Sequence, residues 1–189
     1  HLTFDQNDVG RLGVRALMNP PIRYTEDKDK LWSRLKDGTI DCIVTDHAPH
    51  TLEAKSAGFP NAPAGMPGVE TSLPLMLTHA KEGRCSVSDV VKWMCAGPAK
   101  VYGIQNKGSL IEGFDGDLTL VDLENHRTIQ DSDTWTRVGW TPYAGMELTG
   151  WPMYTIVDGN IVHKRELGGN LRGSPVALPG STGRVLKFK

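Results

Sequence analysis

A short, mostly apolar run between Ile40 and Val44, directly after a helical pattern, constrains the fold of this sequence more than any other feature. The preceding residues 25–38, TEDKDKLWSRLKDG, have a threonine suited to capping, acidic residues in the first turn and a closing glycine, which predicts a helix. The apolar run lacks the regular alternation of a surface strand, so it predicts a buried strand of a parallel sheet. A helix that leads into a buried strand is typical of α/β folds.

A long loop rich in proline and glycine follows the predicted strand. Between His47 and Gly68 it contains four prolines and three glycines, and it is too long to be a simple connection. Loops above about 12 residues are usually functional or disordered, and we interpret this one as functional. Asp46 stands where the strand meets the loop, which is the position at which α/β barrels hold their catalytic groups.

Two further helices are predicted after the loop, over residues 70–83 and 86–94. Ser86 and Asp89 match the pattern of a capping box at the start of the second helix. Pro74 falls within the first turns of the first one, where the missing amide proton does no harm.

The chain becomes rich in β-like segments beyond residue 103. Residues 118–121 and 154–157 predict short strands, and the turn sequence Asp-Gly-Asn at 158–160 predicts a hairpin into residues 161–163. Residues 168–189 are rich in glycine and proline and lack periodicity. We therefore predict an α/β part over residues 1–103, a small β domain over 104–167 and an extended C-terminal arm over 168–189.

The composition argues against several classes of protein. The chain has 21 Lys and Arg against 22 Asp and Glu, so no strong net charge would attract nucleic acid. No apolar stretch approaches the roughly 18 residues needed to cross a bilayer. Three cysteines in no zinc-ribbon or redox pattern indicate reduced thiols, so we expect a cytoplasmic protein. From the charge balance and the lack of long apolar runs we expect neither nucleic-acid nor membrane partners. The first residue is histidine rather than methionine, from which we expect a processed chain or a fragment.

Three side chains that titrate or bind metal ions gather at the start of the loop. Asp46, His47 and His50 lie within five residues, and Pro49 stiffens the backbone between the two imidazoles. This pattern favours a catalytic role. The residues by themselves leave a structural alternative open, in which Asp46 caps a turn and the two histidines are exposed to solvent.

The segment TDHAPHTLEAK at residues 45–55 resembles the signature of bacterial-type dihydroorotases, which belong to the amidohydrolase superfamily. Three other segments are similar to family segments and follow in the same order. They are MNPPIR at 18–23, PAGMPGVET at 63–71 and WTPYAGMELTGWP at 140–152. The likeness covers most of the chain up to about Gly159.

The resemblance implies the last part of a (β/α)8 barrel followed by a small β-rich domain of the composite β-sandwich type. It implies that Asp46 ends strand eight, binds a metal ion of a one- or two-zinc centre and acts as general base and then general acid. It further implies that Asn19 and His50 contact the substrate, and that backbone groups of Ala64 and Gly65 hold the substrate's ring-amide and carboxylate edges.

The other metal ligands of the family have no counterpart in this sequence. Family members add a His-x-His pair, a bridging carboxylate or carboxylated lysine and two further histidines, and His1 matches none of these. Because one aspartate cannot complete a zinc site and a whole barrel needs about 250 residues, the remaining ligands are expected outside this chain. A fragment of this kind is expected to be inactive by itself.

Several functions follow from these patterns. The first is reversible hydrolysis of dihydroorotate to carbamoyl aspartate in pyrimidine synthesis, a reaction on a small cyclic amide. A hydantoinase or allantoinase would open related rings with the same chemistry. A non-catalytic scaffold, for instance for a transcarbamoylase, would keep the barrel without the reaction. We expect a homo-oligomer, with a transcarbamoylase as a further partner.

Overall fold

The computed structural model describes residues 1–166, 168–169, 171–176 and 185–188. The chain divides into two compact units, and each is built from segments that are separate in the sequence. The first unit contains residues 1–40, 45–72 and 128–146, and the second contains 41–44, 73–127 and 147–189. Both units therefore draw on residues before and after 103, and the domain boundary expected there stays a prediction. Parts of the predicted C-terminal arm, at 170, 177–184 and 189, lie outside the described residues.

The first unit begins with helix α1, Gln6–Leu12, which continues into a 3-10 turn at Gly13–Ala16. The Asp5 carboxylate accepts a hydrogen bond from the amide of Asn7 at 3.0 Å, and the Asp8 carboxylate accepts one from the amide of Asp5 at 3.1 Å. These bonds satisfy amides that the helix itself leaves without acceptors, and they explain why α1 starts here.

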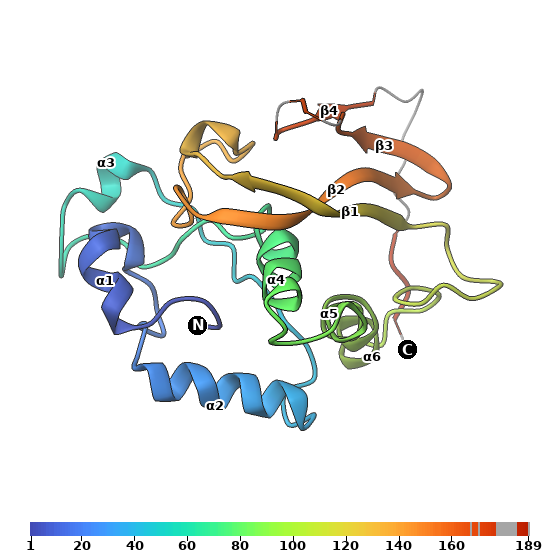
Figure 1. Cartoon of the computed structure of the whole chain (residues 1–189), viewed down its shortest axis with the longest axis horizontal. Coiled ribbons are helices and arrows are strands. Elements are labelled where there is room, and N and C mark those ends of the chain that lie inside the picture. The colour runs from blue at the N-terminus through green and yellow to red at the C-terminus, as the bar shows by residue number, and fades with distance from the viewer. Residues whose placement is uncertain (167, 170, 177–184, 189) are drawn as a thin grey trace. The chain divides into compact units, whose positions relative to one another are not determined.

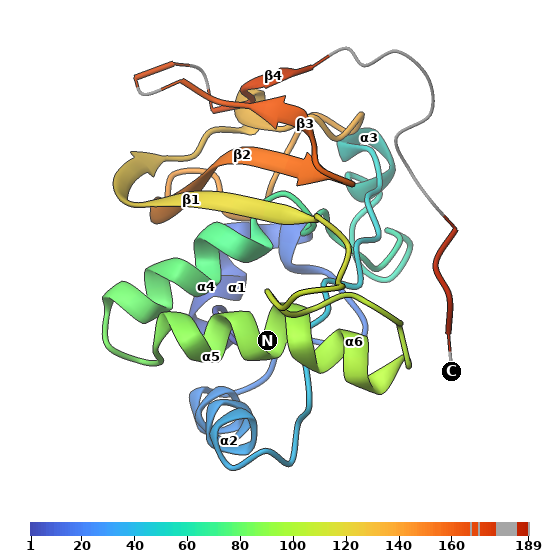
Figure 2. The ribbon, with the colours of Figure 1, turned by 90° about the vertical axis from the view of Figure 1, so that its right-hand side faces the viewer.

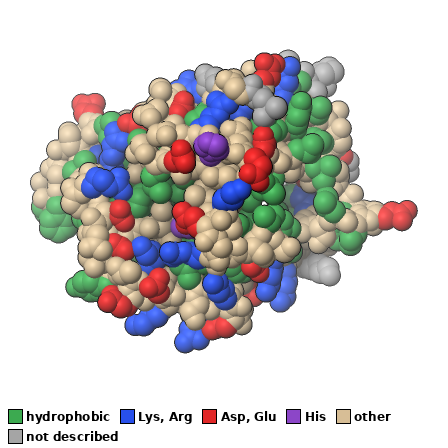
Figure 3. Space-filling view, in the orientation of Figure 1, with side chains coloured by type: hydrophobic (Ala, Val, Ile, Leu, Met, Phe, Trp, Pro, Cys, Tyr) green, Lys and Arg blue, Asp and Glu red, His purple; other side chains and the backbone are tan. Residues whose placement is uncertain are grey.

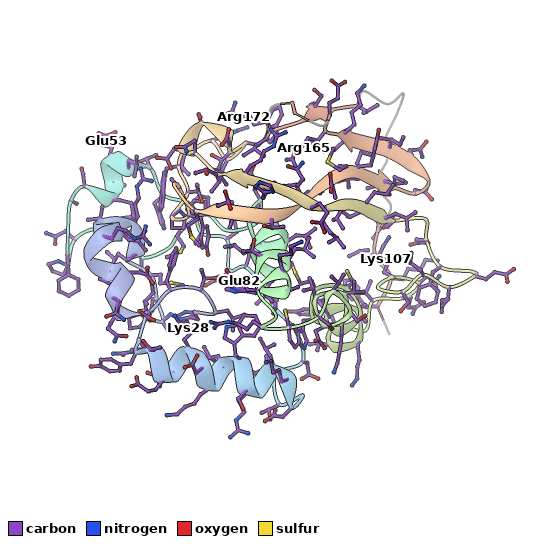
Figure 4. All side chains as sticks on the ribbon, viewed as in Figure 1. Lys28, Glu53, Glu82, Lys107, Arg165 and Arg172 are labelled. Carbon is purple, nitrogen blue, oxygen red and sulfur yellow. The ribbon has the colours of Figure 1, made fainter. Side chains whose placement is uncertain are left out.

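Helix α2, Thr25–Lys36, confirms the helix expected from residue 25, but its capping differs from the expectation. Tyr24 is the N-cap residue, and no side chain caps the helix. The Thr25 hydroxyl instead donates a hydrogen bond to the Asp5 carboxylate at 2.9 Å. It therefore does not cap the helix. Lys28 projects from α2 toward the N-terminal segment, as Figure 4 shows, and its Nζ lies 2.6 Å from the same carboxylate.

Aromatic and aliphatic side chains form the core of the first unit. Phe4, Leu12 and Ala16 are buried together, and the ring of Phe4 stacks on that of Tyr143 with 4.9 Å between centroids. Burial raises the pKa of Tyr143 to about 12, because the charged phenolate would lose its hydration. The short helix α3, Leu52–Lys55, lies within the long loop, and the 3-10 turn Asp131–Asp133 completes the unit.

The expected buried strand at 40–44 is not a strand in this structure. Its residues are half-buried or exposed, and Val44 is 64% exposed. The amide of Ile43 donates to the carbonyl of Trp93 at 2.9 Å, so the segment lies against a helix of the second unit. A strand needs the backbone of a neighbouring strand, and none of the described strands pairs with this segment.

Four helical segments precede the sheet in the second unit. Helix α4, Ser72–Lys81, begins two residues later than expected and holds Pro74 in its first turn. Helix α5, Val87–Val91, has the predicted capping box, with Asp89 amide to Ser86 hydroxyl at 3.1 Å and Ser86 amide to Asp89 carboxylate at 2.9 Å. It continues through a π-helical turn at Lys92–Ala96 into α6, Gly97–Val101. A Cβ on Gly97 would lie 2.5 Å from the carbonyl oxygen of Asp41, so only glycine fits at this crossing.

The described strands form one sheet in the order β1-β2-β3-β4, which Figures 1 and 2 show from two sides. Strand β2 pairs antiparallel with β3, with Val157 opposite Asn160, and the ladder contains an irregularity after Thr155. The turn residues Asp158 and Gly159 both have positive φ, 51° and 76°, as a two-residue type I′ hairpin requires. The hairpin expected from the sequence is confirmed. The strand bounds are Leu118–Thr128, Glu147–Val157, Asn160–Lys164 and Ser174–Pro175.

Helix α4 packs directly on strand β2. The amide of Thr149 donates to the hydroxyl of Thr78 at 2.8 Å, and a Cβ on Gly150 would lie 2.5 Å from that of Leu77. The small residue therefore lets the helix approach the strand closely. Leu148 and Trp151 are almost fully buried.

Charged side chains of both signs are interspersed on the face shown in Figure 3. None of the described helices is long and apolar enough to cross a lipid bilayer.

A candidate active site in the loop from Thr45 to Thr71

Asp46 lies exposed at the start of the loop. Its φ of 44° is in the left-handed region, which a non-glycine residue adopts at some energetic expense and which aspartate tolerates better than most. Among the described residues its carboxylate has no hydrogen-bond or ion-pair partner. Strained backbone of this kind is found at functional sites. The expected strand before Asp46 is absent, and the catalytic role of Asp46 stays a prediction.

His47 connects the two ends of the loop by hydrogen bonds. Its Nδ1 accepts hydrogen bonds from the amides of Gly68 at 3.1 Å and Val69 at 3.2 Å. Nδ1 therefore carries no proton, and the proton of the neutral ring is on Nε2. A neutral imidazole that binds a metal through Nε2 must carry its proton on Nδ1, where these two amide hydrogens lie. In this arrangement His47 is a structural residue and not a metal ligand.

His50 and Ala64 are brought together across the loop. The Nε2 atom of His50 lies 3.1 Å from the carbonyl oxygen of Ala64, and because a carbonyl only accepts, Nε2 must donate. The indole N–H of Trp140 donates to the carbonyl oxygen of His50 at 2.8 Å. Trp140 is fully buried, so this bond joins the half-buried His50 backbone to the core of the unit.

Gly65 cannot be replaced by a larger residue without moving the loop. Its φ is 134°, and a Cβ would lie 2.6 Å from the carbonyl oxygen of Ala48 and 3.2 Å from the His50 ring. Both the backbone conformation and the close approach require glycine. The geometry therefore joins three of the residues expected at the site, His50, Ala64 and Gly65.

Asn19 is exposed and lies on a segment that hydrogen-bonds to the loop. The amide of Gly65 donates to the carbonyl oxygen of Leu17, two residues before Asn19, at 3.0 Å. The backbone near Asn19 is thus connected to the loop, while its side chain has no hydrogen-bond partner among the described residues. The roles expected for Asn19, His50, Ala64 and Gly65 stay predictions at this stage.

Sequence reasoning missed the most buried polar group of the loop, the ammonium of Lys55. This side chain is fully buried, and burial lowers its pKa because the charged form loses hydration. Its Nζ donates to three backbone carbonyls of the same unit. Lys55 ends the segment TDHAPHTLEAK, but a lysine in a short sequence motif gives no signal that it is buried.

A second loop, around residues 134–141, accepts bonds at two acidic side chains, of which Glu70 belongs to the first loop. The Glu70 carboxylate accepts hydrogen bonds from the amides of Trp135 at 2.7 Å and Thr136 at 2.8 Å. Asp131 pairs with Arg15 at 2.6 Å and accepts from the amide of Thr141. Burial alone would raise the pKa of Asp131, but the hydrogen bonds and charge of Arg15 outweigh it, and the pKa is lowered.

The described residues do not form a metal site by themselves. No group of three His, Cys, Asp or Glu side chains among them is arranged to hold a metal ion. Asp46 is a single potential ligand and His47 is used by the loop, whereas zinc in proteins binds three or four side chains. A metal bound at Asp46 would need ligands from elsewhere.

The sequence of this chain is similar to those of known proteins. A dihydroorotase of Halobacterium salinarum is 42% identical over 162 residues, which are 86% of this chain and 38% of the relative. A dihydroorotase of Shouchella clausii is 41% identical over 167 residues, 88% of this chain and 39% of the relative. The chain thus spans about two fifths of the length of the curated relatives it matches.

Solved structures give the same grouping. An L-hydantoinase (dihydropyrimidinase) from Arthrobacter aurescens superposes with a TM-score of 0.84 at 34% identity, over 93% of this chain and 39% of that chain. A dihydropyrimidinase from Brevibacillus agri gives 0.81 at 25% identity, over 94% and 42%. These likenesses imply an α/β fold that contains a (β/α)8 barrel, of which the described chain is a part with an antiparallel sheet. The sequence model of the amidohydrolase family matches residues 12–162, and the chain belongs to that family.

Proposed function

We propose that the natural protein containing this chain is a dihydroorotase, which reversibly hydrolyses the ring of dihydroorotate to carbamoyl aspartate. The observation that carries the proposal is the contact between His50 and Ala64 at 3.1 Å beside Gly65. Three of the four residues that the family resemblance assigns to the substrate, His50, Ala64 and Gly65, are neighbours in space. Identities of 41–42% to dihydroorotases support the same substrate over the related cyclic amides.

In this proposal Asp46 moves the proton. Its exposed carboxylate is without a partner among the described residues, so it is available to take a proton from an attacking water and pass it to the departing ring nitrogen. We include one or two zinc ions in the proposal, with Asp46 as one ligand and the others from residues outside this chain.

The substrate would be held by polar groups on two segments. The amide of Asn19 offers both a donor and an acceptor to the ring edge, and backbone groups of Ala64 and Gly65 would bind the opposite edge. His50 already donates from Nε2 to Ala64. It would therefore bind a substrate carboxylate in one of two ways: Nε2 would donate to the substrate in place of Ala64, or a protonated Nδ1 would donate to it.

The remaining features of the proposal concern the whole protein. We propose a complete (β/α)8 barrel with a composite β-sandwich domain, to which the sheet β1–β4 contributes. We further propose a cytoplasmic homo-oligomer, with a transcarbamoylase as a partner.

The decisive experiment is a ring-opening assay of the natural full-length protein with dihydroorotate and with a hydantoin. Turnover of dihydroorotate is expected. The fold likeness to an L-hydantoinase, with a TM-score of 0.84, favours hydantoinase as the second candidate, and turnover of the hydantoin alone would select it. A protein that turns over neither ring and contains no zinc would be a scaffold.

The role of Asp46 has its own test in the same assay. Asp46→Asn removes the proton acceptor at nearly constant size, so kcat is expected to fall about 10²- to 10⁴-fold. Asp29→Asn, on the exposed surface of α2, is the matched control and should leave kcat unchanged. A variant Asp46→Asn with full activity would remove Asp46 from the mechanism.

A further inference from the structure

Lys55 is the last residue of α3, and its side chain is fully buried in the first unit. Its Nζ lies 2.7 Å from the carbonyl oxygen of Leu17, 3.1 Å from that of Pro63 and 2.8 Å from that of Gly65. An ammonium group has three N–H donors, so these bonds use all of them. The side chain is therefore saturated with backbone acceptors from two separate segments.

The acceptors are next to the residues proposed to bind substrate. Leu17 lies two residues before Asn19, Pro63 immediately precedes Ala64, and Gly65 is itself one of the proposed residues. Because Lys55 also follows His50 by five residues on the same chain segment, one ammonium group links the three parts of the proposed binding site.

Stability alone gives a weak reason for a charge at this position. Among the described residues no carboxylate pairs with Lys55, and its Nζ lies over the ring of Trp140 at 6.0 Å from the ring centroid, the outer limit of a cation–π contact. Burying a charge costs free energy, and apolar side chains of similar volume often replace buried ions without loss of stability. What an apolar side chain does not provide is a fixed point that holds three carbonyl groups in one geometry.

We propose that Lys55 is a positioning residue for substrate binding, which holds the Leu17–Asn19 segment and the Pro63–Gly65 segment in register through their carbonyl oxygens. This inference rests on the proposed function, since it concerns the same site. Lys55 touches no substrate atom in this proposal; it acts through the backbone that carries Asn19, Ala64 and Gly65.

The first test is kinetic and uses the natural full-length protein. Lys55→Met keeps an unbranched side chain that is one atom shorter and removes the three donors. We expect KM for dihydroorotate to rise about 10- to 100-fold while kcat changes less than about threefold, because loose binding segments weaken substrate binding more than proton transfer. Lys36→Met, on the exposed surface of α2, is the control for removing a lysine and should change neither constant.

The pattern of constants separates positioning from general damage. A partly unfolded preparation has fewer active molecules, which lowers kcat at constant KM. That result, or unchanged constants, would overturn the proposal. Lys55→Arg retains charged donors and is expected to recover part of the lost affinity; a KM as high as that of Lys55→Met would contradict a role for the hydrogen bonds.

The second test needs no activity and so distinguishes this inference from the proposed function. The amide of Gly65 donates to Leu17 O at 3.0 Å, and the amide of Ile129 donates to Met146 O at 3.0 Å in the same unit. In Lys55→Met the Gly65 amide should exchange with solvent deuterium at least about tenfold faster, and the Ile129 amide should not change. Unchanged exchange at Gly65, or equal acceleration at both amides, would reject Lys55 as a local anchor even if no ring is opened. Should Lys55→Met fail to fold, Lys55→Arg is measured in the same way, with faster exchange at Gly65 alone expected.

Discussion

The loop at residues 45–71 and the sheet β1–β4 are held by different kinds of hydrogen bonds. In the sheet, backbone pairs with backbone, as in the ladder of β2 and β3. In the loop, side chains add to backbone pairs such as the Gly65 amide and the Leu17 carbonyl: Lys55 donates to three carbonyls, and His47 accepts from two amides. Part of the bonding of the loop thus depends on the identity of a few residues, whereas the ladder of the sheet does not.

This difference has a consequence for function. A loop defined by side-chain anchors can hold an irregular backbone, with Asp46 at a φ of 44° and Gly65 at 134°. The regular part of a ladder does not offer such conformations, because its dihedral angles are those of a strand; β2 departs from them at Gly150, with a φ of 82°. The same dependence makes the loop vulnerable, since the loss of one anchor leaves buried backbone groups without partners.

The strongest test of the comparison is Gly65→Ala. The added Cβ meets the Ala48 carbonyl at 2.6 Å, in a backbone conformation that L-residues avoid, so the free energy of unfolding should fall by about 2–4 kcal/mol in urea denaturation. Gly58→Ala is the control: its φ is 69° and no atom lies within 4 Å of the new Cβ, so strain alone should cost about 1 kcal/mol. Equal costs for the two variants would show that the contact with Ala48 yields without resistance.

Trp140→Phe tests an anchor of the loop at a single hydrogen bond. Phenylalanine keeps an aromatic ring of smaller volume, and the bond of 2.8 Å from the indole N–H to the His50 carbonyl is lost. The lost bond and the unfilled volume together should lower the free energy of unfolding by about 2 kcal/mol. Tyr24→Phe, at a side chain that is 61% exposed, should change it by less than about 0.5 kcal/mol. If Trp140→Phe were equally silent, the indole bond would not be an anchor.

Asp5 ties α1 and α2 together through its charge, so it predicts a dependence on pH. The hydrogen bond from Lys28 is the largest of the effects that lower the pKa of Asp5 to about 2, below an unfolded value near 4. Its contribution is therefore complete above about pH 4 and is lost as the pH falls toward 2. The melting temperature of Asp5→Asn should fall less between pH 4 and pH 2 than that of the unchanged protein. Parallel curves would mean that other carboxylates cause the acid sensitivity.

The smallest effect is expected for a single side-chain contact in the second unit. Lys81 of α4 and Glu124 of β1 form an ion pair of 2.8 Å, and both side chains are mostly exposed. Because water and salt screen such pairs, Lys81→Met should change the free energy of unfolding by less than about 0.5 kcal/mol. A loss as large as that of Trp140→Phe would break the contrast between the sheet and the loop.

The sequence predicted elements whose signals are local. The capping box of Ser86 and Asp89 and the hairpin at Asp158-Gly159 are confirmed, because each depends on residues no more than a few positions apart. The threonine cap of α2 was wrong, since Asp5 takes the Thr25 hydroxyl from 20 positions away. The strand at 40–44 was wrong for a similar reason, because a strand requires a distant partner that periodicity does not reveal.

For the candidate site, sequence determined the motif and therefore the family, with Asp46, Asn19, His50, Ala64 and Gly65 as expectations. Only the tertiary structure decided which of these groups meet and what holds them. Lys55 illustrates the reason: one of its acceptors is 38 positions away, and neither burial nor the convergence of three carbonyls leaves a trace in local sequence. Local hydrogen bonding follows from neighbouring residues, whereas an anchor depends on segments that only the folded chain brings together.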